Sequence, residues 1–529
     1  MFNERAPFPC RAAGAVAGRV CSVARVGRGS AFEIPGDQAV AQGAEHVDVL
    51  IVGAGISGVG AACHLTQECP EKSYLILEAQ ETFGGTWWTH RYPGVRSDSD
   101  LFTFGYRFKP WRGAPLATGE EILRYMGEVM EEYDLAPHIR YQHRITSASW
   151  SSDDRRWTVH ITRTDTGEEL RITTNFLWMC QGYYRHGQGY TPTWEGMDRF
   201  RGRIVHPQTW PDDLDLTDKR VVVIGSGATA ATLIPSIAGK CGHVTMLQRS
   251  PTFFFVRPNT NELADTLREL DIPDEWTHEI LRRKIVREGE AITRMSFEAP
   301  DELRAFILDA IRPHLPEGFD IEKHFSPTYR PWQQRIAVVL EGDLFAAIRE
   351  GQASIVTDQI RSITETGIDL ISGETLEADL IVTATGFELS VLGDIAFTVD
   401  NEAVDLSDTV TYRGVMFTGI PNLAYVFGYF RASWTLRADL ISELVCRLLH
   451  AMEGRGSTMV VPALRADETD MELQPWVDPE NFNPGYLTRS VHLMPKQGDR
   501  EPWQLLHDYG IEKELFAAVV FEDGALVFK

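Results

Sequence analysis

Two glycine-rich turns in this sequence have the spacing that binds the diphosphate of a dinucleotide. The first turn follows an apolar run at residues 47–52 and precedes a helical pattern at residues 59–65. The positions expected to bind the ligand are Gly53, Gly55, Ser57 and Gly58. Glycine allows the backbone to approach a diphosphate closely, and the N-terminus of the following helix offers free N–H groups to the anion. Strand, turn and helix in this order predict a dinucleotide-binding unit.

The residue that follows the second strand of each unit indicates which dinucleotide the unit binds. Glu78 ends the strand at 74–77, and its carboxylate can accept hydrogen bonds from a ribose 2′-hydroxyl, so the first unit suits FAD. The second unit offers Gly225, Gly227, Ala228 and Thr229 in its turn, and Arg249 and Ser250 after its second strand. A guanidinium can bind a 2′-phosphate through two parallel hydrogen bonds, so the second unit suits NADPH.

Each turn is followed by a hairpin and a strand that returns to a glycine. The strand at 176–180 leads to Gly182, and the strand at 380–385 leads to Gly386, so both glycines are expected beside a cofactor. This internal repeat predicts an α/β fold with two dinucleotide-binding, Rossmann-like domains. The expected parts are an extension at 1–45, an FAD-binding domain at 46–190 and 379–529 that includes the C-terminal tail, an NADPH-binding domain at 191–258 and 331–378, and a helical insertion at 259–330.

The insertion is expected to be helical because Leu303, Ile307 and Ile311 follow the spacing of one helix face, together with Phe306. It either caps the cleft between the two nucleotide sites or forms a plain solubilising subdomain. We favour the cap.

Composition excludes several classes of function. The chain has 529 residues, which predicts two or three domains, and a net charge of -24, which argues against a nucleic-acid partner. No apolar run is long enough for a membrane span. Seven cysteines without a CxxC pair indicate neither a disulfide framework nor a zinc site, so no metal is expected and the compartment is expected to be reducing.

The N-terminal extension contains five arginines and no acid between Arg5 and Phe32. This composition is typical of an organelle-targeting peptide and also of a disordered extension. We favour the disordered extension and therefore expect a cytoplasmic protein.

The segment from Gly84 to Asp98 is irregular but rich in aromatic residues and charge. A loop of this kind after a cofactor-binding strand is expected to cover the flat ring of the flavin, with Thr86, Trp87 and Asp98 as contacts. Facing FAD and NADPH sites predict hydride transfer from nicotinamide to flavin. Because no redox cysteine pair stands at CxxC spacing, molecular oxygen is the leading acceptor of the electrons.

The segment from Phe200 to Trp210 contains Gly202 and His206 in the pattern FxGxxxHxxxW. With the Gly84–Asp98 loop, this pattern resembles the type I Baeyer–Villiger monooxygenases, a branch of the flavin-containing monooxygenases. The resemblance runs from about residue 47 to about residue 500, and it is closest to the bacterial ethionamide-activating subgroup.

The resemblance implies an FAD- and NADPH-dependent monooxygenase. Oxygen would add at flavin C4a, and the peroxide would convert a small apolar ketone to an ester or lactone. The alternative is oxidation of sulfides, thioamides or amines, and the remote alternative is a flavin redox protein that does not oxygenate.

The resemblance also implies three residue roles. Arg335 would stabilise the oxygen anions, Asp98 would hold this arginine, and His206 would couple domain rotation to catalysis. Gln334 departs from the lysine that relatives carry before the arginine, which leaves more of the NADPH phosphate contact to Arg249.

Overall fold

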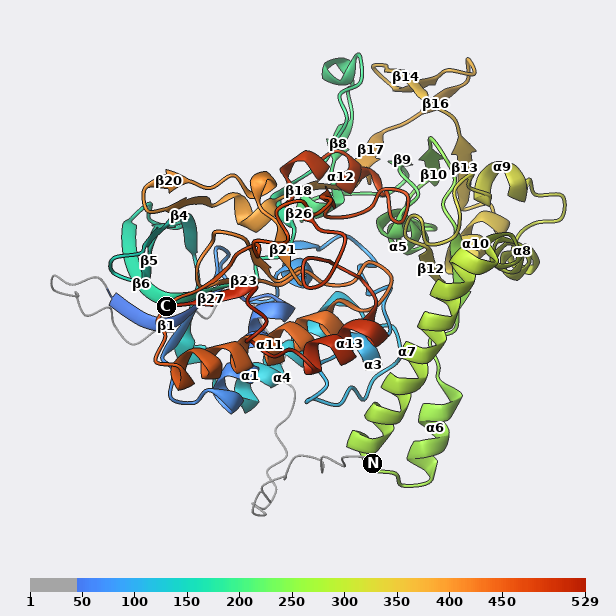
Figure 1. The fold of residues 1–529 in the computed structure, drawn as a ribbon. Helices are drawn as coiled ribbons and strands as arrows, with labels where there is room; N and C mark the ends of the chain where they lie inside the picture. The colour runs from blue at the N-terminus through green and yellow to red at the C-terminus, as the bar shows by residue number, and fades with distance from the viewer. Residues whose placement is uncertain (1–44) are drawn as a thin grey trace, which may run out of the picture. The chain divides into compact units, whose positions relative to one another are not determined.

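A computed structural model describes residues 45–529 (Figure 1). The expected extension at 1–45 lies outside the described residues except for Glu45, the first residue of strand β1. Two sheets organise the described part, and each contains the strand that leads into one of the two glycine-rich turns.

The first sheet has nine strands in the order β20-β19-β4-β5-β6-β1-β2-β3, with β23 also paired to β6. Its centre is parallel, with β1 between β2 and β6, whereas β4, β5 and β6 form an antiparallel meander. Val49, Leu50 and Ile51 of β1 are fully buried, as expected for a strand covered on both faces. The strands are β1 (Glu45–Val52), β2 (Tyr74–Leu77), β3 (Ile139–Arg140), β4 (His143–Ser151), β5 (Arg156–Arg163), β6 (Glu169–Met179), β19 (Ala396–Val399), β20 (Glu402–Ala403) and β23 (Leu423–Tyr425).

Helix α1 (Ile56–Glu68) follows the first turn and packs on this sheet with α4 (Gly119–Glu132) and α11 (Trp434–Gly454). Gly53 has a φ of +97°. A Cβ atom at Gly58 would lie 1.8 Å from the carbonyl oxygen of Gly53. Only glycine at residue 58 therefore lets helix and strand approach this closely.

The second sheet is fully parallel, with the order β13-β10-β9-β17-β8. Helices α5 (Ala228–Ile237) and α10 (Asp343–Arg349) pack on one face, and the three-stranded sheet β14-β15-β16 packs on the other. The strands are β8 (Arg203–Val205), β9 (Arg220–Ile224), β10 (His243–Gln248), β13 (Ala353–Thr357), β14 (Ile360–Ile363), β15 (Gly367–Leu370), β16 (Thr375–Glu377) and β17 (Leu380–Thr383).

The position of β17 corrects one expected boundary. We expected residues from 379 onward to return to the FAD-binding domain, but β17 pairs with β8 and β9 and so lies inside the second sheet. The chain changes sheets at β7 (Tyr184–Gly189) and again at β18 (Phe387–Leu389), and these two strands pair antiparallel. Both crossings therefore run side by side.

The insertion is helical, as expected, and contains α6 (Glu262–Glu269), α7 (Asp274–Glu298), α8 (Pro300–Ile311) and α9 (Ile321–Phe325). It is flanked by β11 (Phe254–Arg257) and β12 (Ala337–Leu340), which pair in parallel. Figure 1 shows α7 as a long helix that runs from the side of the second sheet towards α6.

The expected apolar face of α8 is present at Leu303, Ile307 and Ile311, which are buried, but Phe306 is 57% exposed. The buried guanidinium of Arg282 on α7 donates to the carbonyl of Gly105 at 2.9 Å and to Asp439 at 3.2 Å. Gly105 follows the short helix α3 (Leu101–Phe104). The insertion is thus anchored on the first domain.

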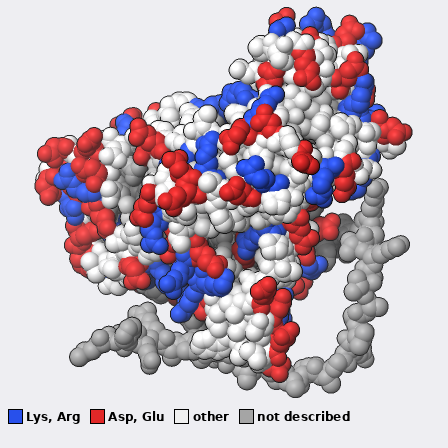
Figure 2. Space-filling view, turned by 90° about the vertical axis from the view of Figure 1, so that its right-hand side faces the viewer, with Lys and Arg blue, Asp and Glu red and all other residues white. Residues whose placement is uncertain are grey.

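The C-terminal part contains α11 and several short elements. Helix α11 is buried along most of its length rather than on one face. The others are β21 (Thr411–Tyr412), β22 (Met416–Phe417), β24 (Val460–Pro462), β25 (Gln474–Pro475), α12 (Gly485–Thr488), β26 (Lys496–Gln497), α13 (Tyr509–Ala517) and β27 (Leu526–Phe528). Among residues 45–529, no helix is both long and apolar enough to cross a membrane. Lys and Arg on the face in Figure 2 are interspersed with Asp and Glu.

We predict that Gly58→Ala releases FAD and lowers the midpoint of thermal unfolding, because the new methyl group must displace the backbone at Gly53. The measurement is flavin absorbance per polypeptide after gel filtration. Gly127→Ala in α4 is the control, since its methyl group would lie 3.6 Å from Phe83. In a helix interior this change should stabilise the protein by about 0.5–1 kcal/mol. Full flavin retention in Gly58→Ala would refute the packing argument.

Candidate active site

A cavity of about 1120 Å³ lies between the two glycine-rich turns. Both domains contribute to its wall. The predicted site residues that line it are Gly53, Gly55, Ser57, Glu78, Thr86, Trp87, Asp98, Gly182, Gly227, Ala228, Thr229, Arg335 and Gly386. From the insertion at 259–330, Tyr329 is the one lining residue. The expectation that helices α6 to α9 cap the cleft is therefore wrong, because α7 packs on the first domain instead.

Glu78 is fixed at the cavity wall by main-chain hydrogen bonds. The amide of Ala54 donates to Oε2 at 2.8 Å, and the amide of Gln80 donates to Oε1 at 2.8 Å. Burial raises the pKa of this carboxyl group, and the amide donors oppose that rise. The acid thus stands beside the first turn, where the ribose of a dinucleotide lies in folds of this type.

The loop after β2 is anchored on the first turn. The amide of Gly84 donates to the carbonyl of Ala54 at 3.0 Å. The short helix α2 (Thr86–Thr89) follows, and Tyr184 donates its hydroxyl hydrogen to Thr86 Oγ1 at 2.6 Å. These contacts bring Thr86 and Trp87 to the cavity wall.

Asp98 and Arg335 form an ion pair inside the cavity. Nη1 of Arg335 donates to Oδ2 of Asp98 at 3.2 Å, and the side chains are 38% and 25% exposed. Two arginines closer to Asp98 in the sequence pair elsewhere: Arg96 with Asp343 at 2.9 Å and Arg91 with Glu81 at 3.9 Å.

Burial alone would lower the pKa of Arg335. The carboxylate of Asp98, together with Tyr183 and Tyr486, outweighs this effect and raises the pKa above its ordinary value. Arg335 is therefore a permanent cation at the cavity wall.

The residues predicted to bind the second nucleotide lie partly in the cavity wall and partly outside it. Gly227, Ala228 and Thr229 line the cavity, whereas Gly225 lies behind it, where a Cβ atom would be 2.2 Å from the carbonyl oxygen of Ala384. Arg249 and Ser250 are exposed directly after β10 and lie outside the cavity wall. Within the described part of the chain, Arg249 forms no ion pair, so its charge is available to a phosphate at the end of β10.

His206 does not line the cavity but links the two chain crossings. Its Nε2 donates to the carbonyl of Gly386 at 3.1 Å, and its Nδ1 accepts from the amide of Gln208 at 3.1 Å. A Cβ atom at Gly189 would lie 1.9 Å from the ring. Burial lowers the pKa of His206, so the imidazole is neutral near pH 7.

Several lining residues carry no spacing motif, and the sequence did not single them out as cavity residues. Trp434 donates from Nε1 to Ser57 Oγ at 2.8 Å, and its ring stacks on Tyr183 with centroids 5.3 Å apart. Tyr486 comes from the C-terminal tail and lies near Arg335. These three aromatic residues reach the cavity from segments distant in the sequence, so periodicity could not reveal them.

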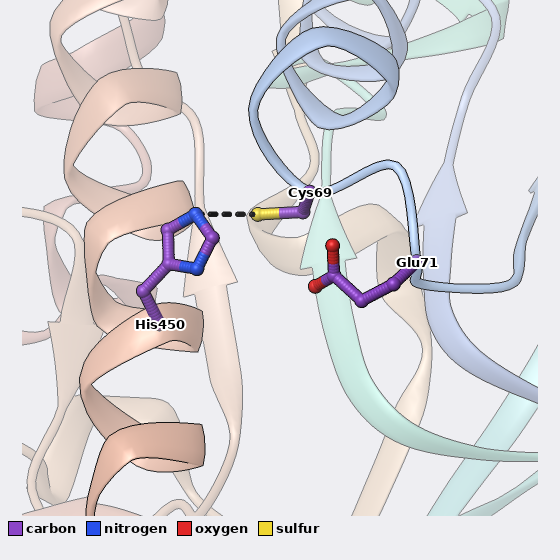
Figure 3. Close-up of side chains that lie close together, drawn as sticks. All are labelled: Cys69, Glu71 and His450. Carbon is purple, nitrogen blue, oxygen red and sulfur yellow. Dashed lines mark hydrogen bonds between the residues drawn. The ribbon is translucent and has the colours of Figure 1, made fainter.

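A separate cluster of metal-type donors occurs at the end of α1. Cys69, Glu71 and His450 lie close together, with 3.6 Å between Cys69 Sγ and His450 Nε2 (Figure 3). The same Nε2 donates to the carbonyl of Glu68 at 2.8 Å, so this nitrogen carries a hydrogen. In this structure Nε2 of His450 therefore serves as a hydrogen-bond donor to the end of α1. The cluster lies outside the cavity.

Comparison with known proteins agrees with this geometry. Residues 51–110 match the NAD(P)-binding Rossmann-like domain, and residues 115–263 match the Flavin-binding monooxygenase-like family. The chain is 47% identical to the FAD-containing monooxygenase EthA of Mycobacterium tuberculosis over 92% of its length and 98% of that protein. The chain belongs to the family of FAD-containing, flavin-binding monooxygenases.

Further relatives of this flavin monooxygenase span nearly its whole length. The probable FAD-binding monooxygenase AlmA of Acinetobacter baylyi is 42% identical over 92% of this chain and 96% of that protein. A steroid monooxygenase bound to NADP shares the fold with a TM-score of 0.73 at 24% identity, over 91% of this chain and 99% of that one. Cyclohexanone monooxygenase from Rhodococcus sp. Phi1, bound to NADP⁺, shares the fold with a TM-score of 0.70 at 22% identity, over 92% of this chain and 100% of that one.

These findings confirm the predicted fold class and, through the family of FAD-containing monooxygenases, the predicted FAD. Among the solved structures that share the fold, one is bound to NADP and another to FAD and NADP. They also confirm a flavin-dependent monooxygenase, so the remote alternative of a flavin protein that does not oxygenate is wrong.

We predict a pH-dependent stability that depends on His186, which lines the cavity. Burial lowers the pKa of His186 from 6.5 to about 4. Between these values the unfolded chain binds more protons than the folded protein, so stability falls as the pH falls through this window, by at most about 1.4 kcal/mol per pH unit. His186→Asn should flatten the slope of the thermal midpoint against pH, whereas the exposed His160→Asn should not. Equal slopes in all three proteins would contradict this.

Proposed function

We propose that this enzyme inserts one oxygen atom from O2 into small apolar ketones and so produces esters or lactones. The observation that carries the proposal is the Asp98–Arg335 ion pair, which holds a permanent cation at the wall of the cavity between the two nucleotide sites. FAD reduced by NADPH supplies the oxygen-activating chemistry. The protein supplies binding, orientation and a fixed positive charge.

Arg335 is proposed to stabilise negative charge that develops on oxygen. Activated oxygen that stays anionic is a nucleophile and would attack the carbonyl carbon of a ketone. Activated oxygen that is protonated is electrophilic and would react with sulfur or nitrogen instead. Asp98 accepts from one guanidinium nitrogen, which leaves further N–H groups of the arginine for a second anion. Such donors are preorganised, so they need no rearrangement during the reaction.

Asp98 is proposed to position the arginine. It projects from the loop after β2, whereas Arg335 lies just before β12. The ion pair thus ties the flavin side of the cavity to the nicotinamide side.

His206 is proposed to couple the two domains rather than to transfer protons. Its two hydrogen bonds fix one neutral tautomer and connect the segment after β8 to Gly386 after β17. Gly386 lies where the chain passes back to the first sheet, and the His206 ring packs against Gly189 in the other crossing, so a rotation of one domain must act on these contacts.

The nucleotide contacts follow from the same geometry. We assign the first turn, Glu78 and the loop with Thr86 and Trp87 to FAD, and the second turn with Arg249 and Ser250 to NADPH.

Oxidation at sulfur or nitrogen is the second candidate. The likeness to the ethionamide-activating subgroup favours it, because ethionamide is a thioamide. The aromatic wall at Trp87, Phe387 and Trp434 suits an apolar ketone and an apolar sulfide alike.

We expect the wild-type enzyme to convert an aliphatic ketone to its ester faster than it converts an aryl sulfide to its sulfoxide. The test compares kcat/KM for the ketone with kcat/KM for the sulfide at saturating NADPH. Mass spectrometry establishes the identity of each product. A sulfoxide product together with an unreacted ketone would overturn the proposal in favour of the second candidate.

We predict that Arg335→Ala lowers ketone oxygenation by about 10²–10³-fold, because an anion-stabilising donor is lost. Anaerobic reduction of the flavin by NADPH should remain within a fewfold of wild type. Arg203→Ala is the control, since exposed Arg203 also pairs with a carboxylate, Asp213, at 3.2 Å. Undiminished ester formation by Arg335→Ala would show that the assigned role is wrong.

A further inference from the structure

Two arginines lie on segments that lead into the cavity wall, with the carboxylate of Asp478 near enough to act on the charge of Arg330. The guanidinium carbons of Arg330 and Arg431 lie 4.0 Å and 5.0 Å from the ring centroid of the same residue, Phe297. Within residues 45–529, neither arginine forms an ion pair, although the chain carries a net charge of -24. Two guanidinium groups held against one ring repel each other, and this arrangement favours an anion that neutralises both.

Neutral oxygen atoms hold the two arginines in place. Nη2 of Arg330 donates to the carbonyl of Asn481 at 2.9 Å. Nη2 of Arg431 donates to the carbonyl and the side-chain oxygen of Asn481, both at 2.6 Å, and its Nε donates to the carbonyl of Trp332 at 3.2 Å. These contacts orient the guanidinium groups without cancelling their charge.

The charge persists despite partial burial. Burial and the neighbouring charge of Arg330 lower the pKa of Arg431 to about 10, so Arg431 stays protonated near pH 7. Nη1 of Arg431 and Nε of Arg330 have no hydrogen-bond partner among the described residues, and both can donate to a ligand.

The segments that carry Arg330 and its acceptor Asn481 continue into the cavity wall. Gln334 and Arg335 follow Arg330, and Pro484 and Tyr486 follow Asn481, and all four line the cavity. Nε2 of Gln334 donates to Oδ1 of Asn483 at 3.3 Å, which ties the two segments together. Arg431 lies on a third segment, and Trp434, three residues after it, also lines the cavity, so each arginine lies within a few residues of the cavity wall.

We propose that Arg330, Arg431 and Phe297 form a carboxylate-binding site that holds the acidic end of an elongated apolar substrate. Two guanidinium groups bind a carboxylate through charge-assisted hydrogen bonds. The ring of Phe297, which is 47% exposed, offers an apolar surface to the adjoining chain. That the other end of this ligand carries the ketone to be oxidised rests on the proposed function, whereas the carboxylate site itself does not.

The first test measures binding without turnover. FAD-loaded enzyme is titrated calorimetrically with dodecanoate and with its methyl ester. We expect wild type to bind the acid more tightly, and Arg330→Ala and Arg431→Ala to weaken binding of the acid by about tenfold or more, with the ester unchanged. Arg361→Ala is the matched control, because exposed Arg361 likewise donates to a main-chain carbonyl, that of Ile371, at 2.9 Å.

Three results would overturn the proposal. The first is equal affinity of the wild-type enzyme for the acid and the ester. The second is an equal loss of affinity for both ligands in the alanine variants. The third is a loss of affinity for NADP⁺ but not for dodecanoate in those variants, which would make the site part of the cofactor phosphate contacts. Arg431→Lys keeps the charge, so it should retain most of the affinity for the acid even if Arg431→Ala folds poorly.

The second test joins the site to the reaction. A long-chain keto acid should show a KM at least about tenfold below that of its methyl ester in wild type, and this advantage should disappear in Arg330→Ala. Dodecanoate binding that depends on the arginines, with neither keto compound oxidised, would refute the proposed ketone oxidation and leave the carboxylate site intact.

Discussion

The ion pair between Asp98 and Arg335 is the contact on which the arrangement of this enzyme depends. A guanidinium beside a cavity is costly to desolvate, and the carboxylate 3.2 Å away offsets that cost while it fixes the position of the charge. The two residues come from segments far apart in the chain, one after β2 and one just before β12. The pair therefore joins the loop after β2 to the start of β12 at the wall of the cavity.

The rest of the fold places this pair. Each sheet directs a glycine-rich turn towards the cavity, and Gly58 and Gly225 allow the close packing behind those turns. The chain crosses between the sheets twice, and the paired strands β7 and β18 keep the crossings together. His206 contacts the same region, where its imidazole donates one hydrogen bond and accepts another. This arrangement suits a neutral residue that couples the two domains better than a residue that transfers protons.

Much of this architecture was predictable, because it follows from local sequence. Strand, glycine turn and acid occur within about thirty residues of chain, so the first unit and Glu78 could be placed by spacing alone. The Asp98–Arg335 pair required the family resemblance, since 237 residues separate its members. Tyr183, Tyr486 and Trp434 were not predicted to line the cavity. Their side chains reach it through tertiary packing, and no local sequence pattern marks such a position. The insertion was recognised as helical, but its docking on the first domain through Arg282 depends on carbonyl groups that leave no signature in the sequence.

The most direct test of the account is a double-mutant cycle on product formed per NADPH consumed, with Asp98→Asn, Arg335→Ala and the double variant. If Asp98 acts by holding Arg335, the double variant should be no worse than Arg335→Ala alone, because the carboxylate has nothing left to position. Losses that multiply in the double variant would show that the two residues act independently, and this would contradict the central place given to their ion pair.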